Sequence, residues 1–238
     1  DQYALASDEP QTVMVFSMGA GFCEASAATV TGMVVEVVAS DGIQMGGRDL
    51  DARIFHTLAQ DFQTRYGSDL MGDKTAVRRL LAAAQRAKHT LTVAEETSIE
   101  LEGLHAGVDF FAVVKRSKVE ALLAEELARC VEMASGVWEV AKAKAAETSR
   151  APRLVLNGGC CRMPKLQAML NALQEEGESL CLDLDLEEAA AQGAATQAAS
   201  LVGCAEATPS HLMLFDITAA GLGLSTTGGA MTTIIPRG

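Results

Sequence analysis

Two adjacent glycines, Gly158 and Gly159, lie where the chain passes from an apolar segment into a helix. The apolar residues 154–156 indicate a buried strand, and Pro164 favours the first helical turn, because that position needs no backbone N–H. Glycine lets the backbone approach a ligand closely, and a helix N-terminus presents unpaired N–H groups to an anion. The segment is therefore a candidate nucleotide cradle, although Gly-Gly turns also occur in α/β proteins without a ligand.

A polar helix face is the second group of residues that could do chemistry. Spaced i, i+3, i+4 and i+7, its members would share one side of a helix: Gln85, Lys88, His89 and Thr92. A lysine offers a point charge to a phosphate, and a histidine ring can stack on a base. The same spacing also fits a polar face that only contacts solvent.

A glycine loop, Gly19-Ala20-Gly21, is the third candidate. It follows the apolar residues 11–18 and precedes another apolar stretch, which indicates a hairpin whose tight turn could lie against phosphates. Arg162, just after the Gly-Gly turn, could stack on a base. The three segments predict a split nucleotide site if the fold brings them together.

The composition limits partners and compartment. The 238 residues carry a formal charge of −12, and 49% are apolar, which is enough for a proper core. An acidic chain has no overall attraction to nucleic acid or anionic membranes, and no apolar run is long enough to span a bilayer. The six cysteines form no CxxC motif, which argues against zinc and for a reducing compartment, expected to be the cytoplasm. The chain lacks a secretory leader and starts at Asp1, so the coding sequence is expected to begin upstream.

Apolar periodicity predicts the elements that must hold these residues. The first half of the chain is expected to form a strand at 11–18, one or two more strands joined near Gly32 at 29–39, and then a helix that ends at Gly67. The buried stripe of that helix recurs at every fourth residue, at Leu50, Ile54, Leu58 and Phe62. A second helix, capped by Asp73, is expected to end near Leu91.

The second half of the chain continues with a hairpin and more helices. Residues 97–102 and 108–114 are expected to pair, and a capping box at Ser117 then starts one long helix. The alanine-rich residues 187–201 predict a helix packed closely against a sheet, with Gly193 at the closest approach. This order of elements predicts a mixed α/β lobe with a smaller inserted α+β subdomain.

Four segments carry a resemblance to a known family. They are AVRRLLAAAQRAKHTL at 76–91, GVDFFAVVKRSKVEAL at 107–122, LVLNGGCCRMPKLQAML at 154–170 and EEAAAQGAATQAASL at 187–201. In this order, over residues 11–235, the sequence resembles the seventy-kilodalton heat-shock chaperones of the DnaK type. The resemblance implies an α/β fold, the second lobe of an actin-like (ribonuclease H-like) ATPase domain. That lobe has a mixed sheet flanked by helices and an inserted α+β subdomain.

The resemblance also implies how the chain is divided. The inner, sheet-based subdomain would comprise 11–47 and 124–202, and the outer subdomain 48–123. Residues 203–216, which contain HLMLFD, resemble the family's interdomain linker. Residues 217–238 resemble the first strands of its β peptide-binding domain. In the family a first lobe supplies another phosphate hairpin and a catalytic lysine, so this chain alone is not expected to complete an ATP cleft.

The family's adenosine contacts can be carried over residue by residue. This chain keeps the family residue at four positions: Lys88, Gly158, Gly159 and Arg162. At the other five positions it has Gln85 where the family has glutamate, His89 where the family has the stacking arginine, Thr92 and Cys160 where the family has serines, and Glu187 where the family has aspartate. Apart from Cys160, these residues and the hairpin glycines Gly19 and Gly21 are the predicted contacts for ATP or ADP.

The phosphate hairpin departs further from the family pattern. Where the family has DLGGGTxD, residues 17–24 read SMGAGFCE. Ser17 replaces the aspartate that helps to place the metal and the attacking water, and Phe22 replaces the threonine that reaches the γ-phosphate. No catalytic residue and no metal ligand is therefore predicted on this chain. Ala20 replaces a glycine, with an effect that depends on its φ.

Three functions remain open from the sequence. The first is a heat-shock-type chaperone with weakened or lost ATP hydrolysis and a regulatory or scaffolding role in protein folding. The others are an active ATP-driven chaperone and another actin-fold enzyme, such as a sugar kinase. The resemblance implies unfolded polypeptide clients, co-chaperones, a nucleotide-exchange factor and a role in the stress response. It implies Mg²⁺ only in the full-length protein, and neither nucleic acid nor a membrane as a partner.

Overall fold

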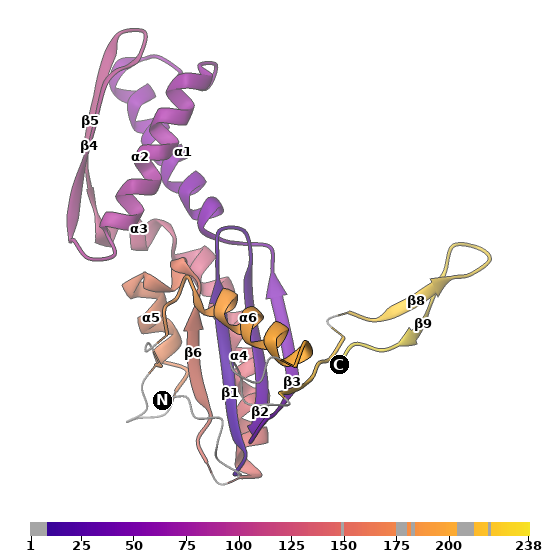
Figure 1. The fold of residues 1–238 in the computed structure, drawn as a ribbon. Helices are drawn as coiled ribbons and strands as arrows, with labels where there is room; N and C mark the ends of the chain where they lie inside the picture. The colour runs from indigo at the N-terminus through magenta and orange to yellow at the C-terminus, as the bar shows by residue number, and fades with distance from the viewer. Residues whose placement is uncertain (1–8, 149, 175–179, 182–183, 204–211, 219) are drawn as a thin grey trace.

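A computed structural model describes residues 9–148, 150–174, 180–181, 184–203, 212–218 and 220–238. Within them, five strands form one sheet: β1 (Gln11–Met18), β2 (Cys23–Thr31), β3 (Val34–Ile43), β6 (Arg153–Asn157) and β7 (Met213–Phe215). The order is β6-β1-β2-β3-β7 (Figure 1). β2 is antiparallel to β1 and β3, whereas β6 runs parallel to β1 and β7 parallel to β3. The predicted mixed α/β class is therefore confirmed.

One face of this sheet is covered by α4 (Ala124–Ala146). β1 alternates in burial, so Met14, Phe16 and Met18 point to the same side and are fully buried. On α4, Leu127 and Trp138 are buried in the same core. This packing fixes the upper end of β1, where the chain turns through the glycine hairpin.

A second group of elements lies beyond the sheet, at the top of Figure 1. It comprises α1 (Gly47–Tyr66), α2 (Lys74–Thr90), β4 (Glu96–His105), β5 (Val108–Lys115) and α3 (Arg116–Leu122). The predicted buried stripe of α1 is confirmed, and Gly67 ends that helix in the left-handed region with φ of 69°. β4 and β5 form the predicted hairpin. Its Phe110 packs edge-on against Phe62 of α1, with ring centroids 5.8 Å apart.

The expected start of the long helix is wrong. α3 already begins at Arg116, directly after β5, so Ser117 lies inside its first turn and no side chain caps its N-terminus. The helix is also interrupted at Leu123, which has ψ of 6° and separates α3 from α4. Two helices therefore stand where the sequence predicts one.

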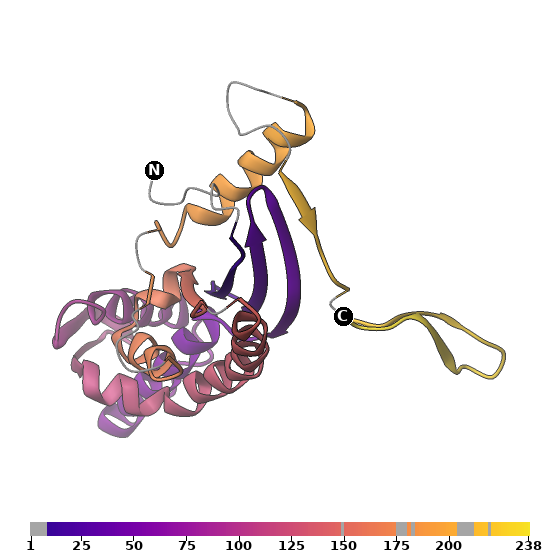
Figure 2. The same cartoon turned by 90° about the horizontal axis from the view of Figure 1, so that it is seen from below.

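The packing expected for the alanine-rich helix α6 (Ala189–Leu201) is also wrong. None of its residues, all of which are described, is buried, and a Cβ on Gly193 would meet no atom within 4 Å. Figures 1 and 2 show α6 on the opposite side of the sheet from α4. Alanine side chains are too short to bridge a helix and a sheet unless the backbones come close, which they do not do here. Among the described residues, no helix has the length and apolar character to cross a bilayer.

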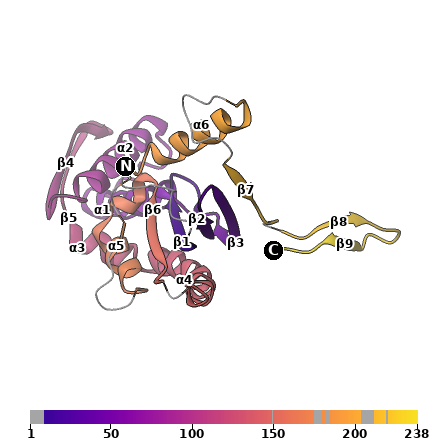
Figure 3. The same cartoon turned by 60° about the horizontal axis from the view of Figure 1, so that its bottom comes forward.

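The C-terminal segment is extended, as predicted. β8 (Leu222–Ser225) and β9 (Met231–Ile235) form an antiparallel hairpin that projects away from the sheet (Figure 3). Arg237 ties its base to the sheet by donating to the carbonyl oxygen of Ser40 at 2.7 Å. Of the expected linker, residues 204–211 lie outside the described residues, and β7 forms the edge strand beside β3.

The cap of α2 predicts a loss of stability in acid. Asp73 Oδ1 accepts hydrogen bonds from Ala76 N and Thr75 N, and Oδ2 lies 3.1 Å from His105 Nδ1. These contacts, led by the bond from Ala76, hold the pKa of Asp73 below its ordinary value. Its contribution to stability is therefore present above the unfolded pKa, about 3.9, and is lost as the pH falls through the lower folded pKa.

Asp73→Asn keeps a capping side chain but cannot titrate. We expect urea unfolding midpoints of this variant to fall less than those of the parent protein when the pH drops below about 4. Glu100→Gln, at an exposed position of β4, is the control, and its unfolding midpoint should fall with pH as steeply as that of the parent. An equally steep fall for the parent and Asp73→Asn would refute the role of this carboxylate.

Candidate functional site

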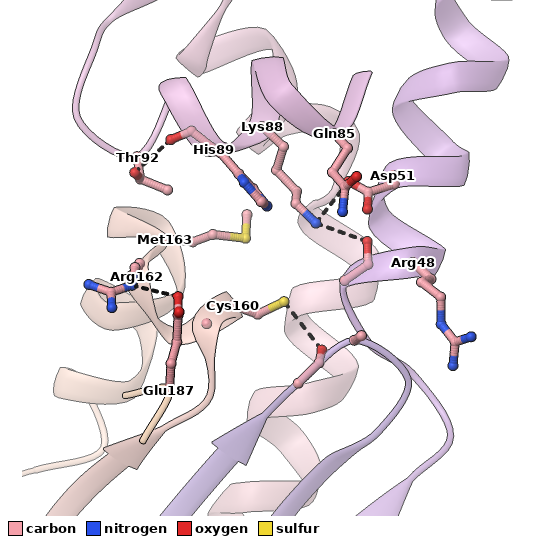
Figure 4. Close-up of a pocket in the computed structure, with 14 residues that line it drawn as sticks. Arg48, Asp51, Gln85, Lys88, His89, Thr92, Cys160, Arg162, Met163 and Glu187 are labelled. Atoms are coloured by element: carbon pink, nitrogen blue, oxygen red, sulfur yellow. Dashed lines mark hydrogen bonds and ion pairs between the residues drawn. The ribbon is translucent and has the colours of Figure 1, made fainter. Parts of the chain in front are cut away.

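A cavity of about 390 Å³ lies where α1, α2, the β1–β2 hairpin and the turn after β6 meet (Figure 4). Its lining residues come from segments far apart in the chain. They are Gly19, Ala20, Gly47, Arg48, Asp51, Gln85, Lys88, His89, Thr92, Gly159, Cys160, Arg162, Met163 and Glu187. The fold thus brings together the three segments that the sequence marks for chemistry.

Most residues predicted to bind nucleotide lie around this one cavity. Those in its wall are Gly19, Gln85, Lys88, His89, Thr92, Gly159, Arg162 and Glu187. Gly21 and Gly158 are not in the wall: Gly21 lies beside the Arg48 guanidinium, and Gly158 lies against the backbone of Met18. Gln85, Lys88 and His89 therefore face a cavity, which argues against a helix face that only contacts solvent. The placement of Thr92 on this helix face is wrong, because α2 ends at Thr90 and Thr92 lies in the turn after it.

The two glycines of the Gly-Gly turn have different surroundings. Gly158 has φ of 88°, and a Cβ there would lie 2.4 Å from the carbonyl oxygen of Met18. Its N–H donates to the carbonyl of Leu186 at 2.6 Å. At Gly159 a Cβ would come no closer than 3.5 Å to another atom, Oε1 of Glu187. The first glycine therefore lets the turn pack on β1, and the second keeps the cavity wall open.

The start of α1 is docked on the β1–β2 hairpin. Gly47 N and Arg48 N donate to the carbonyls of Gly19 and Ala20, each at 2.9 Å. A Cβ on Gly46 would lie 2.5 Å from the hairpin backbone, so only glycine fits this contact. Ala20 has no positive φ, so the alanine that replaces a family glycine is not strained.

A buried ion pair forms the wall between α1 and α2. Lys88 Nζ lies 2.8 Å from Asp51 Oδ1 and donates to the carbonyl of Gly47 at 2.9 Å, and both charged side chains are 7% exposed. The sequence interpretation missed Asp51. The available signal was its position one turn before the buried Phe55, because a carboxylate in an apolar stripe needs a partner.

Cys160 and Arg162 hold the other wall. Burial raises the pKa of the Cys160 thiol, so the thiol is protonated near neutral pH and donates to the carbonyl of Gly19 at 3.3 Å. Arg162 Nε lies 3.5 Å from Oε1 of Glu187, with both side chains well exposed. Arg48, Asp51 and Met163 are wall residues that the sequence interpretation did not single out.

The substituted hairpin residues lie outside the cavity wall. Ser17 Oγ accepts a hydrogen bond of 3.0 Å from Asn157 Nδ2, which joins the ends of β1 and β6. Phe22 is 57% exposed. Neither side chain lines the cavity. Both are therefore placed at the turn without reaching into the space where a ligand would sit.

The residues present fit a nucleoside but not Mg²⁺. The cavity offers amide, hydroxyl, imidazole and guanidinium groups beside an open glycine turn. Its carboxylates Asp51 and Glu187 each face a cation. Within the described ranges, no group of three or more His, Cys, Asp or Glu side chains could hold a metal ion. Mg²⁺ favours carboxylate and water oxygens, so no step through the metal is assigned to these residues.

Comparison with known proteins gives a consistent result. The family model described as Hsp70 protein matches residues 2–238. The chain is 34% identical to heat shock cognate 70 kDa protein 3 of Dictyostelium discoideum, over 94% of this chain and 35% of that protein. It is 33% identical to a ribosome-associated molecular chaperone of Eremothecium gossypii, over 97% of this chain and 37% of that protein. The chain thus spans about a third of the length of the curated relatives it matches.

Proposed function

The chain belongs to the Hsp70 family, and we propose that it forms the adenosine-binding half of a nucleotide site whose ATP hydrolysis is weakened or lost. The family has the actin-like ATPase fold, and its members are chaperones that bind ATP or ADP with Mg²⁺. Membership excludes the sugar kinase alternative. Because the chain covers only part of its relatives, the activity and partners of the whole protein are part of the proposal.

Nucleoside binding is supported by the cavity between α1, α2 and the turn after β6. The base would lie between His89 and Arg162, two groups suited to stacking on a ring. Gln85 and Thr92 would offer polar groups to the ribose or base, and Gly159 would let the backbone approach the ligand. Lys88 would line the cavity beside the ligand while its ammonium group stays paired with Asp51.

Weakened hydrolysis is supported by the hairpin, and this observation carries the proposal. Phosphoryl transfer depends on charge compensation and on a positioned water. Ser17 supplies no carboxylate, and its hydroxyl is already held by a hydrogen bond from Asn157. Phe22 supplies no hydroxyl and is turned out of the cavity. Both side chains that the resemblance assigns to the reacting phosphate are thus absent from this lobe.

The proposed role follows from binding without efficient turnover. Such a protein would assist folding as a regulator or scaffold, with unfolded polypeptides, co-chaperones and a nucleotide-exchange factor as partners. Residues 48–123 would form the outer subdomain, 11–47 with 124–202 the inner one, 203–216 the linker and 217–238 the start of a peptide-binding domain. An active ATP-driven chaperone is the second candidate, favoured by relatives that are named as heat shock 70 kDa proteins.

Restoring the family residues tests the proposal. We expect Ser17→Asp combined with Phe22→Thr to raise the single-turnover rate of ATP hydrolysis in Mg²⁺ about tenfold or more. The threonine hydroxyl would regain a hydrogen bond to the charged γ-phosphate, on the order of 1.5–3 kcal/mol, and the carboxylate would again help to place the metal and the attacking water. The measurement uses the protein expressed from its full coding sequence, because the resemblance assigns part of the ATP cleft to a first lobe.

The matched control is Val15→Asp, which adds a carboxylate on the same exposed side of β1 but away from the cavity. It should leave the rate unchanged. Parent turnover equal to that of an ordinary Hsp70 chaperone would instead establish the active-ATPase alternative. An unchanged rate in the restored variant would place the defect outside the hairpin.

A further inference from the structure

Charge in the cavity is balanced everywhere except at Arg48. Among its described wall residues, Lys88 faces Asp51 at 2.8 Å and Arg162 faces Glu187 at 3.5 Å. Within the described part of the chain, no carboxylate lies within ion-pair distance of the Arg48 guanidinium. A chain with a formal charge of −12 therefore presents one uncompensated cation in this wall.

The position of Arg48 is fixed by the docking of α1 on the hairpin. Its backbone N–H donates to the carbonyl of Ala20, and its Nη2 lies 2.7 Å from where a Cβ on Gly21 would be. Figure 4 shows the side chain reaching down from the start of α1 beside the turn. The guanidinium thus lies at the glycine turn, on the side of the cavity where the phosphates of a bound nucleotide would lie.

Among the described residues of the cavity wall, no carboxylate is left unpaired to place a metal. Ser17 stands in the place that the resemblance gives to an aspartate, and its hydroxyl accepts from Asn157. The carboxylates of the wall, Asp51 and Glu187, face cations of their own. A phosphate at the turn would therefore meet a guanidinium rather than a metal-binding group.

We propose that Arg48 takes the charge-compensating role of Mg²⁺ on this lobe, so that it binds the phosphates of ADP or ATP without a metal. This inference rests on the proposed nucleotide site. A guanidinium offers paired N–H donors that match two phosphate oxygens, and such charge-assisted bonds are stronger than neutral ones. Free ADP is more negatively charged than its Mg²⁺ complex, so the metal should bring no gain in affinity here.

The test is an NMR titration of the ¹⁵N-labelled protein, expressed from its full coding sequence, with adenosine, with ADP in excess Mg²⁺, and with ADP in EDTA. We expect ADP to bind at least as tightly in EDTA as in Mg²⁺. Arg48→Ala should lower the affinity for ADP about tenfold or more and change the affinity for adenosine by no more than about twofold. Arg48→Lys should retain part of the ADP affinity, since a lysine keeps the charge but not the paired donors.

Arg86→Ala is the matched control, because Arg86 is an exposed arginine of α2 outside the cavity wall. It should change neither affinity. If Mg²⁺ strengthens ADP binding several-fold, or if Arg48→Ala affects ADP no more than Arg86→Ala does, the role of Arg48 is wrong while the nucleotide site stands. If neither adenosine nor ADP shifts any resonance, the proposed site itself is wrong.

Discussion

Replacing Lys88 with alanine is expected to destabilise the protein by about 3–5 kcal/mol, because it leaves the Asp51 carboxylate buried without its cation. Both side chains are 7% exposed, so the Asp51 carboxylate would lose its cation in a largely desolvated position. The variant also removes the donor to the carbonyl of Gly47, at the first residue of α1. A loss of this size is a large part of the total stability of a typical domain, about 5–15 kcal/mol.

Urea or thermal unfolding measures the loss of stability, and two further variants serve as a control and as a test of rescue. Lys74→Ala, an exposed lysine on the same helix, is the control and should change stability by less than about 0.5 kcal/mol. Lys88→Met combined with Asp51→Leu should recover most of the loss, since an apolar pair of similar volume can replace a buried ion pair. A single variant as stable as the parent would show that the pair does not hold α1 to α2.

The outcome bears on how Lys88 can serve a nucleotide. The resemblance assigns it to the ligand, whereas the structure also gives its ammonium group two protein acceptors. A residue with both roles would show a stability loss without ligand and an affinity loss with it. For that reason Lys88→Ala alone cannot report on binding, and the exposed Arg48 is the better probe of the phosphate side.

The elements with strong apolar periodicity were predictable. The stripe of α1, the cap at Asp73 and the stop at Gly67 all depend on local patterns that the tertiary fold does not override. Only the resemblance could predict that the helix face around Lys88 lies beside the Gly-Gly turn, because contacts between segments far apart in the chain produce no local sequence pattern.

Other features depend on neighbours that no local pattern contains. The apolar stripe of α1 indicates that Asp51 needs a partner, but only the tertiary fold identifies that partner as Lys88. Arg48 gains its position from two backbone hydrogen bonds between the start of α1 and the hairpin. The close packing expected of α6 failed because a small-residue composition permits close approach but does not cause it.

Replacing Gly158 with alanine is expected to destabilise the protein by about 2–6 kcal/mol. Alanine at φ of 88° is strained by about 1–3 kcal/mol, and its Cβ would lie 2.4 Å from the Met18 carbonyl, an overpacking that costs about another 1–3 kcal/mol. The Met18 backbone belongs to β1, which is fixed between β2 and β6, so it has little room to move. Thermal unfolding of the purified variant measures the loss.

Gly159→Ala is the matched comparison, because the same atom is added one residue further along. Its φ lies outside the left-handed region and the nearest atom would be 3.5 Å away, so we expect stability within about 0.5 kcal/mol of the parent. The added methyl group would, however, stand in the cavity wall and should weaken adenosine binding in the NMR titration. Equal effects of the two variants on stability would contradict the separate roles of these glycines. Unchanged adenosine affinity in Gly159→Ala would show that the ligand does not approach the turn at this point.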